Sequence, residues 1–161
     1  MNQQLSPPES LSAAHKLSEF ACGEVLLDDW LKRVALANHL NGASRTFVVA
    51  DPIGQVFGYY AMASGAVAHP DATSAIRRNM PDPVPVMVLA RLAVDQRAQG
   101  IKLGAALLQD AVGRARAGAQ HAGVRAVLVH ALNDRAKQFY EHYGFQPSPI
   151  HPMTLMLRLN S

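Results

Sequence analysis

The chain has 161 residues, the usual size of one globular domain, and 49% of them are hydrophobic, which is enough for a sizeable core. No apolar run approaches the ~18 residues of a transmembrane helix, and residues 1–10 lack the basic and apolar regions of a signal peptide. The net charge of +3 and the pI of about 9.3 permit an anionic partner such as RNA or a coenzyme, without requiring one. Cys22 is the only cysteine, so no internal disulfide can form and a cytoplasmic location is expected.

The apolar pattern predicts a single α/β domain over residues 1–161, with a loose lead-in over residues 1–10. Helices are expected where apolar residues recur every three or four positions, and strands where short runs are rich in β-branched and aromatic residues. In chain order these rules predict a helix over 26–41, strands over 45–50, 55–67 and 86–94, a helix over 100–119, a strand over 124–132, a helix over 135–143 and a strand over 153–159.

The segment His69–Pro85 differs from its surroundings because it holds four prolines. The last three alternate at positions 81, 83 and 85, and they cannot lie inside a central strand because each lacks the N–H donor of the ladder. We therefore expect a surface excursion between two strands. A short helix around Ser74–Asn79 would carry the neighbouring arginines Arg77 and Arg78.

A loop over Asp95–Gly104 joins the predicted strand Val86–Val94 to an amphipathic helix. The first N–H groups of a helix have no intrahelical partner and carry partial positive charge, so anions bind there. Gly100 and Gly104 allow a phosphate to approach the backbone closely. A plain glycine-containing turn is the alternative interpretation of these residues alone.

The run Arg97-x-x-Gly100, after Leu92-Ala93-Val94 and before Leu103-Gly104, resembles motif A of the GCN5-related N-acetyltransferase (GNAT) superfamily. In that family the pattern Gln/Arg-x-x-Gly-x-Gly/Ala cradles the pyrophosphate of acetyl-CoA. This chain departs from the pattern at Lys102, where Gly or Ala is usual. A lysine there must point its side chain outward, where its charge could lie near a coenzyme phosphate.

The run Asn133–Phe145 resembles a second pattern of the same superfamily, Asn-x-x-Ala-x-x-x-Tyr-x-x-x-Gly-Phe. Together the two motifs imply a GNAT fold: a central, mixed, twisted sheet flanked by helices, with strands splayed around acetyl-CoA as cosubstrate. The resemblance places a general-acid tyrosine at Tyr140, which reference pKa values leave protonated at neutral pH. A core aromatic on an amphipathic helix is the alternative.

The resemblance also implies the residues that contact the coenzyme. Backbone groups of Leu92 and Val94 would clamp the acetyl carbonyl and the pantetheine arm, and Asn133 would bind the pantetheine or cap the last helix. The expected contacts are Leu92, Ala93, Val94, Arg97, Ala98, Gln99, Gly100, Ile101, Lys102, Leu103, Gly104, Ala105, Asn133, Ala136, Phe139 and Tyr143.

Further runs resemble one branch of the superfamily, the GNAT toxins of bacterial type II toxin–antitoxin modules of the TacT and AtaT type. These runs are Phe20-x-Cys22-Gly23, Leu27–Leu31, Ser44–Val48 and Arg77–Asp95. The resemblance implies acetylation of the α-amine of aminoacyl-tRNA, which blocks translation, a ribbon-helix-helix antitoxin as partner, and a homodimer. Two alternatives stay open: an acetyltransferase for a small amine or a protein amine, and a non-catalytic module that binds acyl-CoA.

Basic residues are the candidates for tRNA binding, because phosphate contacts supply most of the affinity for nucleic acids. The candidates are Lys32, Arg33, Arg77, Arg78 and Arg91, and a solvated face is the alternative. Arg91 lies in an otherwise apolar strand and is costly to bury unpaired, so we expect it to face the substrate cleft or to pair with Asp28 or Asp95. The scattered histidines show no metal-binding spacing, and no metal is expected.

Overall fold

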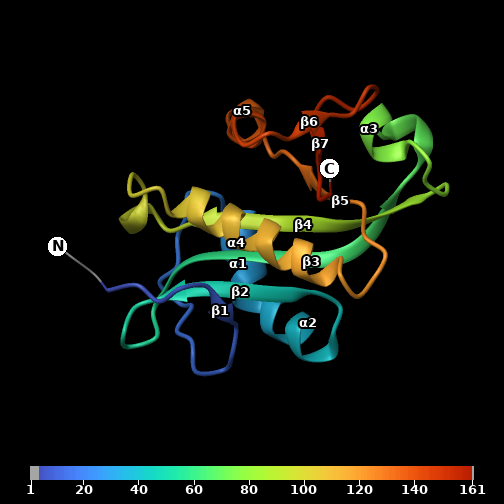
Figure 1. The fold of residues 1–161 in the computed structure, drawn as a ribbon. Coiled ribbons are helices and arrows are strands. Elements are labelled where there is room, and N and C mark those ends of the chain that lie inside the picture. The colour runs from blue at the N-terminus through green and yellow to red at the C-terminus, as the bar shows by residue number, and fades with distance from the viewer. Residues whose placement is uncertain (1–3, 161) are drawn as a thin grey trace. The chain divides into compact units, whose positions relative to one another are not determined.

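A computed structural model describes residues 4–160, and within this range it contains one seven-stranded sheet with the order β1-β2-β3-β4-β5-β7-β6 (Figure 1). β4 and β5 are parallel, whereas β1/β2, β2/β3, β5/β7 and β6/β7 are antiparallel, so the predicted mixed sheet is confirmed. None of the helices in the described range is long and apolar enough to span a membrane.

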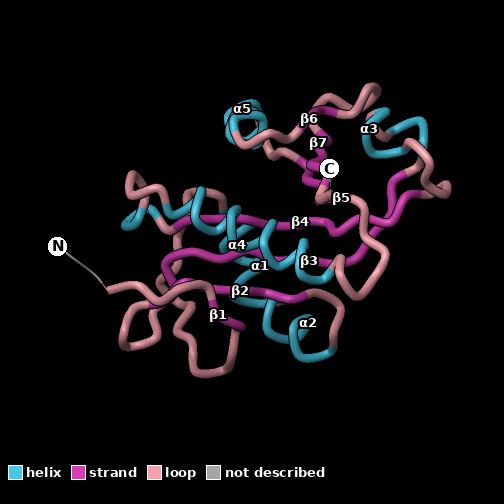
Figure 2. Tube along the Cα trace, viewed as in Figure 1, coloured by secondary structure: helices cyan, strands magenta, loops and turns pink. Residues whose placement is uncertain are grey.

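Figure 2 shows the helices and strands along the chain. Their bounds are β1 Glu9–Ser10, α1 Val25–Arg33, α2 Ala35–Asn41, β2 Arg45–Ala50, β3 Val56–Val67, α3 Ser74–Arg77, β4 Val84–Val94, α4 Leu103–Gly118, β5 Ala126–His130, α5 Asp134–His142, β6 Gln146–Pro147 and β7 Thr154–Arg158, with short 3₁₀ helices η1 His69–Asp71 and η2 Gln96–Ala98. The described chain forms two compact units: the first extends to Ala63 and includes Arg91–Ala111, and the second comprises Ser64–Ala90 and the chain from Val112 onward.

The first unit is built on the β2–β3 hairpin, whose side chains alternate between two faces. Tyr59 is fully buried on one face, where its ring packs against Phe20 and Trp30, and its hydroxyl donates to the carbonyl of Leu27, 2.7 Å away. The adjacent Gly58 meets α4, where an added Cβ would lie 3.0 Å from a Leu107 methyl. This glycine lets the helix that follows the candidate anion loop pack close to the sheet.

The single helix predicted over 26–41 is in fact two, because Val34 takes φ −120° and ψ −37° between α1 and α2. Val34 is β-branched, and such residues are less favourable in helices. Leu31 and Ala35 on either side of the break are both fully buried. Their i, i+4 spacing matches one continuous helix, so the apolar pattern could not reveal the break.

The expectation of a loose lead-in was wrong for the described part of residues 1–10. Glu9 and Ser10 pair with Val48 and Phe47 of β2, and the N–H of Ser6 donates to the carbonyl of Ala50, 2.8 Å away. A sheet edge presents unpaired backbone groups, and this short strand covers them. Residues 1–3 lie outside the described residues.

The second unit places β5 between β4 and β7, with the short α3 over one face of these strands. Ile76 of α3 is buried in a cluster with Val86, Leu128 and Met156. β4 begins at Val84, so the expectation that Pro85 lies outside the strand was wrong. The position is tolerated because it is the second residue of the strand, and the Pro85 carbonyl still accepts from the N–H of Arg125, 2.9 Å away.

Candidate functional site

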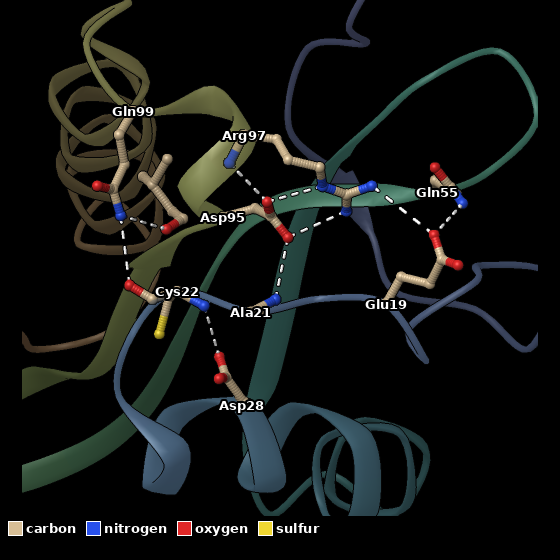
Figure 3. A network of polar contacts seen from close by, with 9 residues as sticks. Glu19, Ala21, Cys22, Asp28, Gln55, Asp95, Arg97 and Gln99 are labelled. Carbon is tan, nitrogen blue, oxygen red and sulfur yellow. Dashed lines mark hydrogen bonds and ion pairs between the residues drawn. The ribbon is translucent and has the colours of Figure 1, made fainter.

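The loop that follows β4 is organised by one buried carboxylate, Asp95, whose residue is 1% exposed (Figure 3). Its Oδ1 accepts from the N–H of Arg97 at 2.8 Å and so caps η2, while its Oδ2 accepts from the N–H of Ala21 at 3.0 Å. The N–H of Ala98 donates to the Asp95 carbonyl, 2.9 Å away. Asp95 therefore fixes the direction in which the chain leaves the strand and anchors the segment before α1.

The Arg97 side chain is bound to the same carboxylate through two hydrogen bonds, Nε to Oδ1 at 2.9 Å and Nη2 to Oδ2 at 3.0 Å (Figure 3). Its guanidinium also lies 4.5 Å above the ring of Phe57 and 3.8 Å from the carboxylate of Glu19. Burial alone would raise the pKa of Asp95, but the hydrogen bonds from Arg97 and Ala21 outweigh it and hold the pKa below its usual value. Arg97 thus supports the loop, and the amides after it are better placed to face a ligand.

The Gln99 side chain holds the loop at a second point. Its side-chain amide donates to the carbonyls of Cys22, at 3.3 Å, and Val94, at 3.2 Å (Figure 3). Burial raises the pKa of the Cys22 thiol to about 11, so the thiol stays protonated at neutral pH and is not an activated nucleophile. The loop is therefore braced at Asp95, Arg97 and Gln99 before it reaches the glycine.

Two residues after these braces take the left-handed conformation, Gly100 with φ 89° and Lys102 with φ 62°. The first hydrogen bond of α4 then runs from the N–H of Ala106 to the carbonyl of Lys102, at 3.2 Å. The amides of Leu103–Ala105 precede this bond and have no partner within the helix, as is typical of helix starts that bind anions. The positive φ of Lys102 costs a lysine energy that a glycine at this position would not pay.

Replacing Lys102 by glycine is expected to stabilise the protein by about 0.5–1 kcal/mol, because glycine adopts a positive φ without steric cost. This gain should appear as a rise in Tm of roughly 1–4 °C in a thermal melt of the purified protein.

Lys137→Gly in α5 is the matched control, since it makes the same chemical change in a helical backbone. It should lower stability by about 1 kcal/mol. A loss of stability in Lys102→Gly as large as in the control would contradict strain at position 102.

The second unit carries the other motif on α5. The Asn133 side-chain oxygen accepts from the N–H of Ala136 at 2.9 Å, so Asn133 is the N-cap of the helix. Tyr140 is 8% exposed and packs against the rings of Phe139 and Phe145, with centroids 5.3 and 5.5 Å away. Burial raises the pKa of Tyr140 to about 12. Tyr140 is thus a buried, protonated hydroxyl, as a general acid requires.

The predicted arginine pair lies at the end of α3, where both Arg77 and Arg78 are exposed. The Arg77 guanidinium also donates to the carbonyls of His69, at 3.3 Å, and Ala72, at 3.4 Å. Arg125 holds the same turn, because its guanidinium donates to three carbonyls of the 75–78 segment at 3.1–3.3 Å. Lys32 and Arg33, in the first unit, are exposed in the last turn of α1.

Arg91 contacts an aromatic ring in place of the expected Asp28 or Asp95, and the other expectation, that it faces the substrate cleft, stays a prediction. Its guanidinium lies 4.5 Å above the indole of Trp30, a cation–π contact. Asp95 is bound to Arg97, and Asp28 accepts from the N–H of Cys22 at 2.9 Å. Stacking on an aromatic face shields a partly buried guanidinium and offsets the cost of placing it in an apolar strand.

Two residues that hold the local backbone in place were not singled out from the sequence. Asp95 was considered only as a partner of Arg91, although an aspartate directly before a short helical turn is a typical N-cap. Arg125 gave no signal, because an arginine at the start of a strand looks like an ordinary surface residue.

Comparison with known proteins agrees with this geometry. The Acetyltransferase (GNAT) domain family matches residues 43–147, well over half of the chain, including both the Asp95–Ala105 loop and α5. The chain belongs to the GNAT acetyltransferase family. The matched residues include the loop after β4 and α5, the two segments that carry the motifs described above.

Individual GNAT relatives narrow the comparison. The tRNA-acetylating toxin of Mycobacterium tuberculosis is 53% identical over 152 residues, which cover 94% of this chain and 91% of the relative. The solved structure of AtaT complexed with acetyl-methionyl-tRNAfMet has a TM-score of 0.89 and 27% identity, covering 96% of this chain and 95% of AtaT. An AtaT variant bound to acetyl-CoA and the C-terminus of the antitoxin AtaR has a TM-score of 0.83 and 28% identity, covering 96% and 93%.

Proposed function

We propose that this GNAT acetyltransferase moves the acetyl group of acetyl-CoA to the α-amine of aminoacyl-tRNA. The observation that carries the proposal is the 53% identity to a tRNA-acetylating toxin over almost the whole of both chains. Similarity of this extent includes the loop, α5 and the segment with Arg77 and Arg78. The matched span therefore covers the segments proposed for the acceptor as well as those proposed for the coenzyme.

On the coenzyme side, the amides at the start of α4 would receive the pyrophosphate. The braces at Asp95 and Gln99 fix the loop before a ligand arrives, which lowers the ordering cost of binding. The positive end of the helix dipole and the side chain of Lys102 both favour the phosphate charges. Leu92 and Val94 would hold the acetyl carbonyl and the pantetheine arm through backbone groups.

In the proposed reaction, the neutral α-amine attacks the thioester carbonyl carbon, a C–N bond forms and the C–S bond breaks. The amine nitrogen loses its proton to solvent, and the departing thiolate takes the Tyr140 proton, which solvent then replaces. Burial raises the pKa of Tyr140, and desolvation in the same site would also raise the basicity of the departing thiolate, which favours the transfer. An α-amine has a pKa near 7.7–8.0, so a large neutral fraction exists without a strong protein base.

Blocking the amine of aminoacyl-tRNA prevents its use in translation, so the activity would be toxic in the cytoplasm where translation occurs. We therefore propose that the chain is the toxin of a toxin–antitoxin pair. The AtaT–AtaR complex supports a proteinaceous partner. We propose a ribbon-helix-helix antitoxin and a homodimer on the family resemblance.

The acceptor is tested by measuring acetyl transfer from radiolabelled acetyl-CoA to three classes of amine in parallel: charged tRNA, polyamines, and peptides with free N-termini or lysines. We expect acetylation of charged tRNA to exceed the others by at least tenfold in kcat/KM. Comparable rates on a polyamine or a peptide would replace the proposed acceptor, and coenzyme binding without transfer to any of them would indicate a non-catalytic module.

Charge reversal at Arg78 is expected to raise the KM for charged tRNA about tenfold while leaving the Kd for acetyl-CoA unchanged. An exposed arginine is accessible to the phosphates of the tRNA, and the loss of such a contact should reduce the dependence of log KM on log salt by about one unit. Arg78→Glu is preferred to Arg77→Glu because the Arg77 guanidinium also donates to His69 and Ala72. Steady-state kinetics at several salt concentrations provide the measurement.

Lys16→Glu is the control, because Lys16 is exposed and the charge change is the same. Lys16→Glu should leave the KM for charged tRNA and the Kd for acetyl-CoA within about twofold of the wild-type values. If the two variants raise the KM for charged tRNA equally, net charge rather than the Arg77–Arg78 turn governs tRNA binding.

A further inference from the structure

The chain leaves the sheet after the end of β3 at Val67 and returns to it at the start of β4 at Val84. Residues 69–82, here named the excursion segment, lie between these ends and belong to the second unit. The segment contains η1 and the four-residue α3. A helix this short gains little stability from its own hydrogen bonds, because its first turn costs more entropy than it returns. The shape of the segment therefore depends on side-chain contacts, of which the burial of Ile76 is one.

His69 joins the two ends of the excursion segment. Its Nε2 lies 3.1 Å from the carbonyl oxygen of Met80 and 2.9 Å from that of Pro81. A carbonyl oxygen can only accept, so Nε2 must carry the hydrogen, as it does in one neutral tautomer and in the imidazolium. The N–H of His69 also donates to Oδ1 of Asp82, 3.1 Å away. One residue at the start of the segment is thus bonded to three consecutive residues at its end.

The two neighbouring arginines of α3 are held in different ways inside this closed segment. The Arg77 guanidinium donates to the carbonyls of His69 and Ala72, so Arg77 strengthens the closure. Arg78 is exposed, and its main-chain carbonyl accepts from the Arg125 guanidinium at 3.3 Å. The segment therefore presents Arg78 as an exposed cation on a fixed backbone.

We infer that His69 is a positioning residue for charged tRNA: it closes the excursion segment and so fixes the backbone that presents Arg78 to a phosphate. This inference rests on the proposed function. A cation on an ordered backbone loses less conformational entropy when it binds a phosphate than one on a mobile loop. His69 acts through Arg78, without a contact of its own to the tRNA.

Three substitutions at His69 separate the hydrogen bonds from the volume of the ring. His69→Ala should raise the KM for charged tRNA about fivefold, because the opened segment must be ordered on binding, and leave kcat and the Kd for acetyl-CoA within about twofold. His69→Phe keeps the ring without a donor and should behave as His69→Ala. His69→Gln keeps a donor at the end of the side chain and should restore the KM to within about twofold of wild type. His121→Ala, at an exposed histidine of the same unit, is the control and should change none of the three constants.

A double-mutant cycle tests whether His69 acts through Arg78. Effects of two residues on one contact are not additive, whereas effects of independent residues are. In an Arg78→Ala background, His69→Ala should therefore raise the KM for charged tRNA by less than about twofold. A rise as large as in the wild-type background would overturn the inference, because His69 would then affect tRNA binding by another route.

The inference and the proposed function fail differently. If the wild-type protein acetylates charged tRNA and His69→Ala does so with the wild-type KM, the role of His69 fails and the proposed function stands. If the wild-type protein acetylates no charged tRNA, the proposed function fails, and the role of His69 with it. If His69→Ala does not fold, His69→Phe and His69→Gln decide, since both keep a large side chain and differ in the donor. Equal KM values in these two variants would overturn the inference.

Discussion

Tyr140→Phe is expected to lower kcat for acetyl transfer by about 10²–10⁴-fold, the range that a positioned general acid supplies. The substitution removes one oxygen from a side chain that is 8% exposed and keeps its aromatic packing on Phe139 and Phe145. The fold and the Kd for acetyl-CoA should therefore be preserved. Turnover on charged tRNA, a thermal melt and calorimetric titration with acetyl-CoA measure the three quantities.

Tyr59→Phe is the matched control for this prediction. Tyr59 is also a fully buried tyrosine whose pKa burial raises, but its hydroxyl donates to the Leu27 carbonyl within the core. Its loss should cost about 1 kcal/mol of stability and leave kcat within about twofold. Near-normal turnover in purified Tyr140→Phe, or equal losses in both variants, would remove Tyr140 from the reaction.

The pH dependence reports the ionisation of the acceptor amine. The protonated hydroxyl is the active form, and a pKa of about 12 keeps it protonated well above neutral pH. The neutral amine is the other active form, and it accumulates as pH rises through about 7.7–8.0. The rate should thus rise to a plateau near pH 9 without a falling limb below about pH 10. In Tyr140→Phe the residual rate should follow the same rising limb, because the amine still titrates.

Most helices and strands could be predicted from the sequence. The spacing of apolar residues shows which side chains are buried, and this pattern differs between a helix and a strand. The strand before the loop, the helix after it and α5 were expected within a few residues of their observed ends. The apolar spacing could not indicate the helix break at Val34, because Leu31 and Ala35 keep helical spacing across it. It also missed β1, because a two-residue strand at a sheet edge has no periodicity to detect.

The candidate site likewise has features that the sequence indicated and features that it could not indicate. Gly100 and Tyr140 could be proposed as site residues because the motifs place a glycine and a tyrosine at fixed spacing. The departure at Lys102 was visible in the sequence, but its cost was not, because the cost follows from a φ of 62°, a backbone property. The partners of Arg91 and Arg97 depend on which side chains tertiary packing brings near, and Trp30 and Phe57 lie far from them in sequence. Sequence patterns name the residues of a site more readily than their partners.

Asp95→Asn is expected to destabilise the protein by about 2–3 kcal/mol and to weaken acetyl-CoA binding at least tenfold. The amide keeps the shape of the carboxylate but carries no charge, and it offers Arg97 only one acceptor oxygen in place of two. The loop would then reach the glycine without its main brace, so coenzyme binding must also order the loop. A thermal melt and calorimetric titration with acetyl-CoA measure both effects.

Glu19→Gln is the control. It removes a surface ion pair from the Arg97 guanidinium and leaves the buried Asp95–Arg97 pair in place. Glu19 lies 3.8 Å from Arg97 with its side chain 67% exposed, so its loss should cost less than about 1 kcal/mol and leave acetyl-CoA affinity unchanged. The pKa of Asp95 is lower in the folded than in the unfolded state, so its stabilisation is complete above about pH 4 and falls as the carboxyl is protonated. The stability gap between wild type and Asp95→Asn should thus be constant near neutral pH and shrink only below pH 4. Because Glu19 and Asp95 share one partner, equal effects of the two variants would mean that Arg97, and not the buried carboxylate, shapes the loop.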